Sequence, residues 1–167
     1  MVRPKELIKK PLTIKFSWLK SQHACEAGIK WFLDQSSSDV IFILDGLIRE
    51  DRFNYANWLI ERVLNPKQLI QYAVFAAEQV IEKYERQYPV NSAPRLAIEA
   101  AKLVIKRNTK INRERAQSAA NAAVNAANAA NAAAYAAYAA AYAANAAYAT
   151  MKQRILTFAL NLLKGEN

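Results

Sequence analysis

A basic cluster between residues 102 and 115 holds the side chains best suited to binding chemistry. Six residues of this segment are Lys or Arg and one is Glu, in a chain of net charge +9. Such a cluster is either the solvated end of a helix or a docking surface for an acidic protein or a polyanion. The segment contains no aromatic residue, although single-strand-binding proteins stack bases on aromatic rings, so nucleic acid is the less favoured partner. The basic residues are Lys102, Lys106, Arg107, Lys110, Arg113 and Arg115.

Candidate catalytic and metal-binding residues are few. His23 lies two residues from Cys25, but a zinc site needs three or four ligands, and the chain has one His and one Cys. We therefore expect a packed thiol and a capping or surface imidazole. Asp45 follows Leu44 and is the one acid that helical spacing could partly bury, and a salt bridge or surface position is expected for it.

The sequence contains no glycine-rich phosphate loop, no nucleophile elbow and no zinc-protease motif. This absence does not exclude an enzyme, but it leaves binding as the default activity. We accordingly expect a protein that is not an enzyme and needs no cofactor or metal.

The composition indicates one domain. The chain has 167 residues, of which 53% are hydrophobic, and one cysteine, which points to a reducing compartment. No apolar run of signal-peptide length follows the start, so a cytoplasmic location is expected. Residues 1–20 carry six basic residues and one acidic residue. The predicted organisation is a basic arm over residues 1–20 and a single helical domain over residues 21–167.

The apolar spacing predicts helices throughout, with no paired strands, and the fold class is all-α. An extended segment, a strand or a short helix fits residues 12–19. Ser21 precedes the first predicted helix, Ser38 or Asp39 caps the second, and Asn65-Pro66 closes the third and opens the fourth. The predicted helices cover approximately residues 25–33, 40–51, 53–64, 66–88, 94–108 and 112–164.

An alanine tract, Ala116 to Ala149, dominates the last predicted helix and has no charge, glycine or proline. Alanine is the strongest helix former. Polar residues recur every three or four positions, which makes a membrane span unlikely, and they form a stripe that either bonds a neighbouring helix or lines a groove. The stripe consists of Gln117, Asn121, Asn125, Asn128, Asn131, Tyr135, Tyr138, Tyr142, Asn145 and Tyr148.

The length of this last helix predicts a break. Residues 113–164 in one helix would be about 78 Å long, which exceeds the width of a compact domain of this size. The break is expected at Asn125 to Asn131 or at Thr150 to Gln153. The predicted architecture is a compact bundle of about six helices around a long alanine-rich helix that is broken once.

Several segments resemble a known family. They are Trp58-Leu59-Ile60 with Arg62, Tyr72 to Glu78, Tyr84-Glu85, and Pro94 to Ala101, followed by Arg115 and the alanine tract. Over about residues 54–151 the chain is similar to the alanine-rich immunity proteins, small helical proteins found beside bacterial toxin genes and, in related forms, in phages. The resemblance implies a non-enzymatic protein that binds and neutralises a partner.

The first hypothesis is therefore a non-catalytic, protein-binding inhibitor of immunity type. Its expected partner-binding residues are the six basic residues of 102–115 together with Tyr135, Tyr138 and Tyr142. The alternative is a phage or mobile-element counter-defence protein, either anti-CRISPR-like or signal-sequestering, that binds a defence complex, a nucleic acid or a nucleotide. A third hypothesis is a metal-free enzyme that acts on a small anion. No membrane partner is expected.

Overall fold

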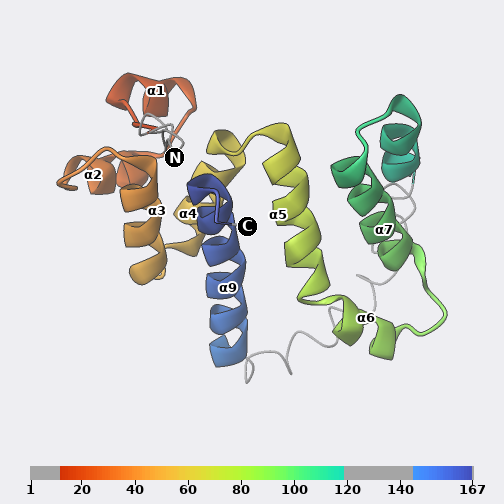
Figure 1. Ribbon diagram of the computed structural model, residues 1–167. Helices are drawn as coiled ribbons and strands as arrows, with labels where there is room; N and C mark the ends of the chain where they lie inside the picture. The colour runs from red at the N-terminus through yellow and green to blue at the C-terminus, as the bar shows by residue number, and fades with distance from the viewer. Residues whose placement is uncertain (1–11, 119–144, 167) are drawn as a thin grey trace, which may run out of the picture. The chain divides into compact units, whose positions relative to one another are not determined.

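The computed structural model describes residues 12–118 and 145–166, and their regular structure is helical (Figure 1). Within these ranges, β pairing is limited to one isolated bridge between Thr13 and Asp39. The predicted all-α class is confirmed. Residues 119–144, with most of the alanine tract, lie outside the described residues, and so does the central helix predicted there. No helix of the described ranges is long and apolar enough to cross a membrane.

The chain divides into two compact units, Met1–Leu59 and Ile60–Asn167. The helix α4, Phe53–Val63, runs across this boundary. The sequence predicts instead an arm over residues 1–20 followed by one domain, and that organisation stays a prediction.

The first unit consists of short helices and one extended segment. The backbone N–H of Ile14 donates to the carbonyl of Ser38 (2.8 Å), and the N–H of Val40 donates to the carbonyl of Leu12 (2.8 Å). Residues 12–14 therefore lie along the start of the third helix, as an extended segment would. The helices of this unit before α4 are α1 Phe16–Ser21, α2 Glu26–Leu33 and α3 Val40–Arg49.

Side-chain caps define where α2 and α3 begin. Asp39 caps α3, because its Oδ1 accepts from the N–H groups of Ile41 (2.9 Å) and Phe42 (3.0 Å), as the sequence predicts. The cap of α2 is Cys25, whose Sγ accepts from the N–H of Gly28 (3.4 Å). His23, just after α1, takes a left-handed backbone conformation (φ 55°).

Apolar side chains from every helix of the first unit form its core. Leu44 is fully buried, and the Trp31 ring is fixed because its Nε1 donates to Glu50 Oε2 (2.7 Å). The buried residues are Ile14, Leu19, Trp31, Val40, Ile43, Leu44, Leu47, Ile48, Ala56 and Leu59.

The second unit is organised around α5, which contacts α6, α7 and α9. Figure 1 shows α5 between α7 and α9. The rings of Phe75 and Phe158 stack with centroids 4.0 Å apart, and Gln68 Nε2 donates to the carbonyl of Leu162 (2.8 Å), so α5 is held to α9 by specific contacts. These helices are α5 Pro66–Glu78, α6 Ile81–Gln87, α7 Ala93–Lys106, an unlabelled helix over 110–118, and α9 Asn145–Lys164.

Two predicted boundaries in the second unit are wrong. The helix predicted over 66–88 is split into α5 and α6 by a turn at Gln79 and Val80, where Val80 has φ −120°. The turn leaves Val80 exposed and buries Ile81, a packing effect that propensity does not show. The break predicted at Thr150 to Gln153 does not occur, because α9 runs through these residues. The break predicted at Asn125 to Asn131 lies outside the described residues.

The predicted capping at Asn65-Pro66 is confirmed, and a glycine ends α9. Asn65 and Gln68 form a reciprocal capping box at α5, with Pro66 in the first turn. Gly165 follows α9 with a φ of 80° and donates its N–H to the carbonyl of Asn161 (3.0 Å). A positive φ is favourable for glycine because it has no Cβ.

Candidate functional site

The basic cluster is positioned by the end of α7 and the helix that follows it. Arg107 leaves α7 in an extended conformation (φ −143°, ψ 101°). Thr109 Oγ1 then accepts from the N–H of Asn112 (3.2 Å), and Asn112 Nδ2 donates to the carbonyls of Arg107 (2.8 Å) and Leu103 (3.4 Å). Asn112 thus ties the new helix to the carboxyl end of α7, where the basic residues emerge on both sides of the turn.

Five of the six basic residues are solvent-exposed, and we call them the basic surface: Lys106, Arg107, Lys110, Arg113 and Arg115. Their one acidic neighbour in this segment is Glu114, which lies 3.8 Å from Lys110 with both side chains more than half exposed. Arg113 donates instead to the side-chain oxygen of Asn108 (2.7 Å). Among the described residues, Lys106, Arg107 and Arg115 form no salt bridge.

Lys102 differs from the other five because its charge is compensated. Its Nζ lies 2.8 Å from Glu78 on α5 and 2.9 Å from Glu99 on α7. The hydrogen bonds that Lys102 donates, to Glu78 and then to Glu99, raise the pKa of Lys102, and the bond that Glu99 accepts lowers the pKa of Glu99. Lys102 therefore joins α7 to α5 rather than extending the basic surface.

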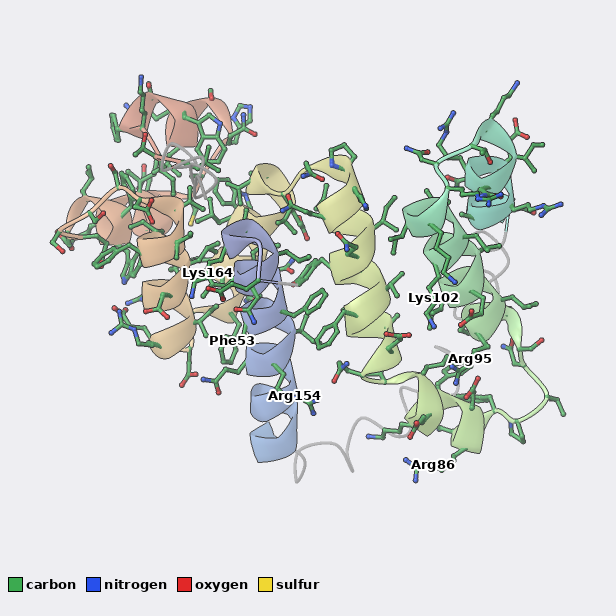
Figure 2. All side chains as sticks on the ribbon, viewed as in Figure 1. Phe53, Arg86, Arg95, Lys102, Arg154 and Lys164 are labelled. Carbon is green, nitrogen blue, oxygen red and sulfur yellow. The ribbon has the colours of Figure 1, made fainter. Side chains whose placement is uncertain are left out.

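Arg95, which lies about two helix turns before Lys102 on α7, has a similar structural role. Its guanidinium donates twice to Glu85, from Nε to Oε1 (2.8 Å) and from a terminal nitrogen to Oε2 (2.6 Å). Figure 2 shows Arg95 and Lys102 on α7. Arg95 and Glu99 both lie in the segment Pro94 to Ala101 that resembles the family, and each has a different partner: Glu85 for Arg95 and Lys102 for Glu99.

Exposed apolar side chains accompany the basic surface. Leu103 is 45% exposed and Ile111 61% exposed, and Leu96, two helix turns before Leu103 on α7, is 59% exposed. Protein interfaces combine apolar contact with a charged, solvated rim. The end of α7 and the start of the next helix offer this combination.

The remaining sequence-predicted residues lie apart from the basic surface or outside the described residues. Tyr135, Tyr138 and Tyr142 fall within residues 119–144. Asp45 is exposed and pairs with Arg49 (2.9 Å), as predicted. The prediction of a packed thiol is wrong, because Cys25 is exposed and caps α2. No group of three His, Cys, Asp or Glu residues in the described ranges could hold a metal ion.

Sequence reasoning missed two apolar cavities. One, of about 350 Å³, lies within the first unit between residues 14 and 59. The other, of about 740 Å³, lies within the second unit between residues 69 and 117, where it is lined by α5, α6, α7 and the helix after α7. Apolar periodicity marks both sets of residues as a core, and periodicity cannot distinguish a filled core from a lined cavity.

A scan against family models gives a match over residues 62–164, to the family described as Imm-5 like putative immunity protein. The match covers more than half of the chain, and the chain belongs to this family. It begins after the first unit and spans nearly all of the second. Searches of curated proteins and of solved structures give no match.

Proposed function

We propose that this member of the Imm-5 like family is a non-catalytic inhibitor that binds a partner protein and neutralises it. We further propose that the basic surface docks on an acidic face of that partner. The observation that carries the proposal is the group of exposed, largely uncompensated basic side chains at the end of α7, within the part of the chain that matches the family.

The charges and apolar groups at this surface suit association with a protein. A patch of one sign attracts an oppositely charged partner and raises the association rate. Leu103 and Ile111 add exposed apolar area that docking would remove from water. Compared with the sequence hypothesis, Lys102 is left out of the docking surface, because Glu78 and Glu99 already compensate its charge.

The three described carboxyl groups with a shifted pKa do not have the shift of a general acid. A general acid is typically a carboxyl group whose pKa is raised towards neutrality. In Glu50, Glu85 and Glu99 the pKa is lowered, and the largest cause in each is a hydrogen bond from a cationic side chain: Arg52, Arg95 and Lys102 respectively. These shifts describe structural ion pairs.

The test is co-expression with the protein encoded beside it, which is the expected toxin. The triple variant Lys106→Glu, Arg107→Glu and Lys110→Glu reverses three charges of the basic surface. We expect it to lose protection against the toxin and to slow association about tenfold or more at low salt, because electrostatic attraction becomes repulsion. Growth of the co-expressing cells and surface plasmon resonance measure the two effects.

A matched control keeps the same change in net charge. Lys67→Glu, Lys83→Glu and Arg86→Glu reverse three exposed basic side chains elsewhere in the second unit. The proposal expects this control to protect cells almost as well as the wild type. Equal loss in both triple variants would show a general charge effect, and full protection by the first variant would remove the basic surface from the interface. Tight, steeply salt-dependent binding to an oligonucleotide would instead favour a polyanion.

A further inference from the structure

The cavity of the first unit has the dimensions and walls of a small-molecule site. Its volume of about 350 Å³ is at the lower end of the range of ligand pockets. All of its lining residues lie between Ile14 and Leu59, before the stretch that matches the immunity family. A function for this cavity is therefore separate from the function proposed above.

The inner wall is apolar and firmly held. Ile14, Leu19, Ile43, Leu47 and Leu59 line it, and each is at most 6% exposed. The wall also includes the ring of Trp31, whose position depends on three neighbouring residues. Its Nε1 donates to Glu50, the Arg52 guanidinium lies 5.9 Å from the ring centroid, and Gly46 leaves room for the ring, since a Cβ there would lie 3.3 Å from Trp31 Cη2.

Aromatic rings form much of the remaining wall. Phe32 and Trp58 line the cavity, and Trp58 packs edge-to-face against Trp18, with centroids 6.3 Å apart. Planar aromatic surfaces favour a planar aromatic ligand, which can stack on them or meet them at an edge. Water in such an apolar space finds few hydrogen-bond partners, so an apolar ligand is favoured over it.

The polar groups of the cavity belong to its more exposed residues. Cys25, His23 and Asn54 are exposed, and Tyr55 is half-buried with its side chain hydrogen-bonded to Cys25. Among the residues that line the cavity, none is Asp, Glu, Lys or Arg. The cavity thus offers hydrogen bonds at its mouth and no carboxylate, ammonium or guanidinium group to balance an ionic ligand.

We propose that the cavity of the first unit binds a neutral aromatic molecule of one or two rings. The rings lie against Trp31 and Trp58, and a single hydroxyl, amide or ring N–H of the ligand points to the mouth beside Cys25 and Tyr55. The mouth selects against charged molecules, because burying an unpaired charge there is costly.

Cys25 and the tryptophans make the proposal directly testable on the full chain. Cys25 is the single cysteine, so alkylation by iodoacetamide, followed by intact mass, reports one thiol at the mouth. All three tryptophans, Trp18, Trp31 and Trp58, belong to the first unit, so their emission reports this unit. The probes are 4-methylphenol and indole, with 4-methylbenzoate as the charged counterpart of the first.

The expected result is slower alkylation of Cys25 in the presence of 4-methylphenol or indole. With 4-methylbenzoate the rate of alkylation should not change. Emission quenched by 4-methylphenol should give the same dissociation constant as thiol protection. Ala24→Phe places a ring in the cavity, whereas Ala27→Phe adds the same ring to an exposed position of α2 that does not line it. Ala24→Phe should weaken both effects about tenfold or more, as misfits in apolar pockets do, and Ala27→Phe should leave them unchanged.

Three results would overturn the proposal. The first is equal protection by the neutral and the charged probes, and the second is no protection by either neutral probe. The third is a Cys25 that does not react in the ligand-free protein, which would show that another part of the chain or a second copy already covers the mouth. If Ala24→Phe does not fold, the variant Tyr55→Phe, which removes only a hydroxyl, replaces it. This variant should weaken the binding of 4-methylphenol more than the binding of toluene. Equal effects on both ligands would count against the proposal.

Discussion

The central helices of the two compact units differ in how deeply their apolar residues are buried. In the first unit, α3 buries Val40, Ile43, Leu44, Leu47 and Ile48 completely or nearly so. In the second unit, α5 is longer than α3 and contacts three helices, yet none of its residues is fully buried. Five of its apolar residues instead line the cavity of about 740 Å³: Leu69, Ile70, Ala73, Val74 and Ala77.

This difference indicates two sources of stability. In the first unit, several short elements enclose an apolar core, so burial of apolar area provides most of the favourable free energy. In the second unit, buried apolar side chains lie on α4, α6, α7 and α9 but not on α5. Individual pairs add to this burial and connect α5 and α7 to their neighbours: the stack of Phe75 on Phe158, the salt bridge from Lys102 to Glu78 and the salt bridge from Arg95 to Glu85. Substitutions should therefore be more costly on α3 than on α5.

The largest expected effect is that of truncating the core of α3. Leu44→Ala should lower the free energy of unfolding by about 2–5 kcal/mol, because it removes a fully buried side chain and leaves a cavity. Leu69→Ala, the same change in a half-buried residue of α5, should cost clearly less. Urea unfolding followed by tryptophan emission and by circular dichroism measures both, and equal costs would contradict the contrast between α3 and α5.

The next effect concerns the aromatic stack of the second unit. Phe75→Ala should cost about 2 kcal/mol, since it removes a ring stacked 4.0 Å from Phe158 together with part of the apolar burial between α5 and α9. Phe75→Leu, which keeps apolar volume, should recover part of the loss. Thermal melts by circular dichroism give the values, and a neutral Phe75→Ala would show that the stack does not hold these helices.

A smaller effect is expected at the start of α3. Asp39→Ala removes the side chain that accepts from the N–H groups of Ile41 and Phe42, and should cost about 1 kcal/mol. Asp39→Asn keeps an accepting oxygen and serves as the control. Tryptophan emission during urea unfolding measures both variants. Similar losses for Ala and Asn would point to the charge of Asp39 rather than its hydrogen bonds.

The smallest effect is a dependence of stability on pH in the second unit. The hydrogen bond from Arg95 lowers the pKa of Glu85 below its usual 4.5, so the folded state favours the ionised carboxylate. The contribution of this pair is present above the unfolded pKa and is lost as the pH falls through the lower folded pKa. Glu85→Gln should therefore reduce the melting temperature slightly at pH 7. At pH 2 the variant and the wild type should melt at the same temperature. A difference that persists at pH 2 would mean that the residue acts by packing.

Much of the helical layout follows from local sequence signals. Asp39 and Asn65-Pro66 mark helix ends by capping chemistry, and the structure confirms both of them. The turn that separates α5 from α6 contains no glycine or proline, so the sequence does not predict it. The side chain of Gln79 donates to the carbonyl of Phe75 (3.2 Å), and Ile81 becomes buried beyond the turn. Local propensity could not show this, because tertiary packing decides which side of a helix is buried.

The candidate sites divide in the same way. The sequence by itself determined that six basic residues gather within residues 102–115, that the fold is helical, and that the spacing of His23 and Cys25 is insufficient for a zinc site. Only the tertiary structure decided that Glu78, from a helix distant in sequence, compensates Lys102 while the other five basic residues stay exposed. It also brought Trp31 and Trp58 to one cavity. Charge and helical period are local properties, whereas the partner of a charge and the filling of a core depend on which helices meet.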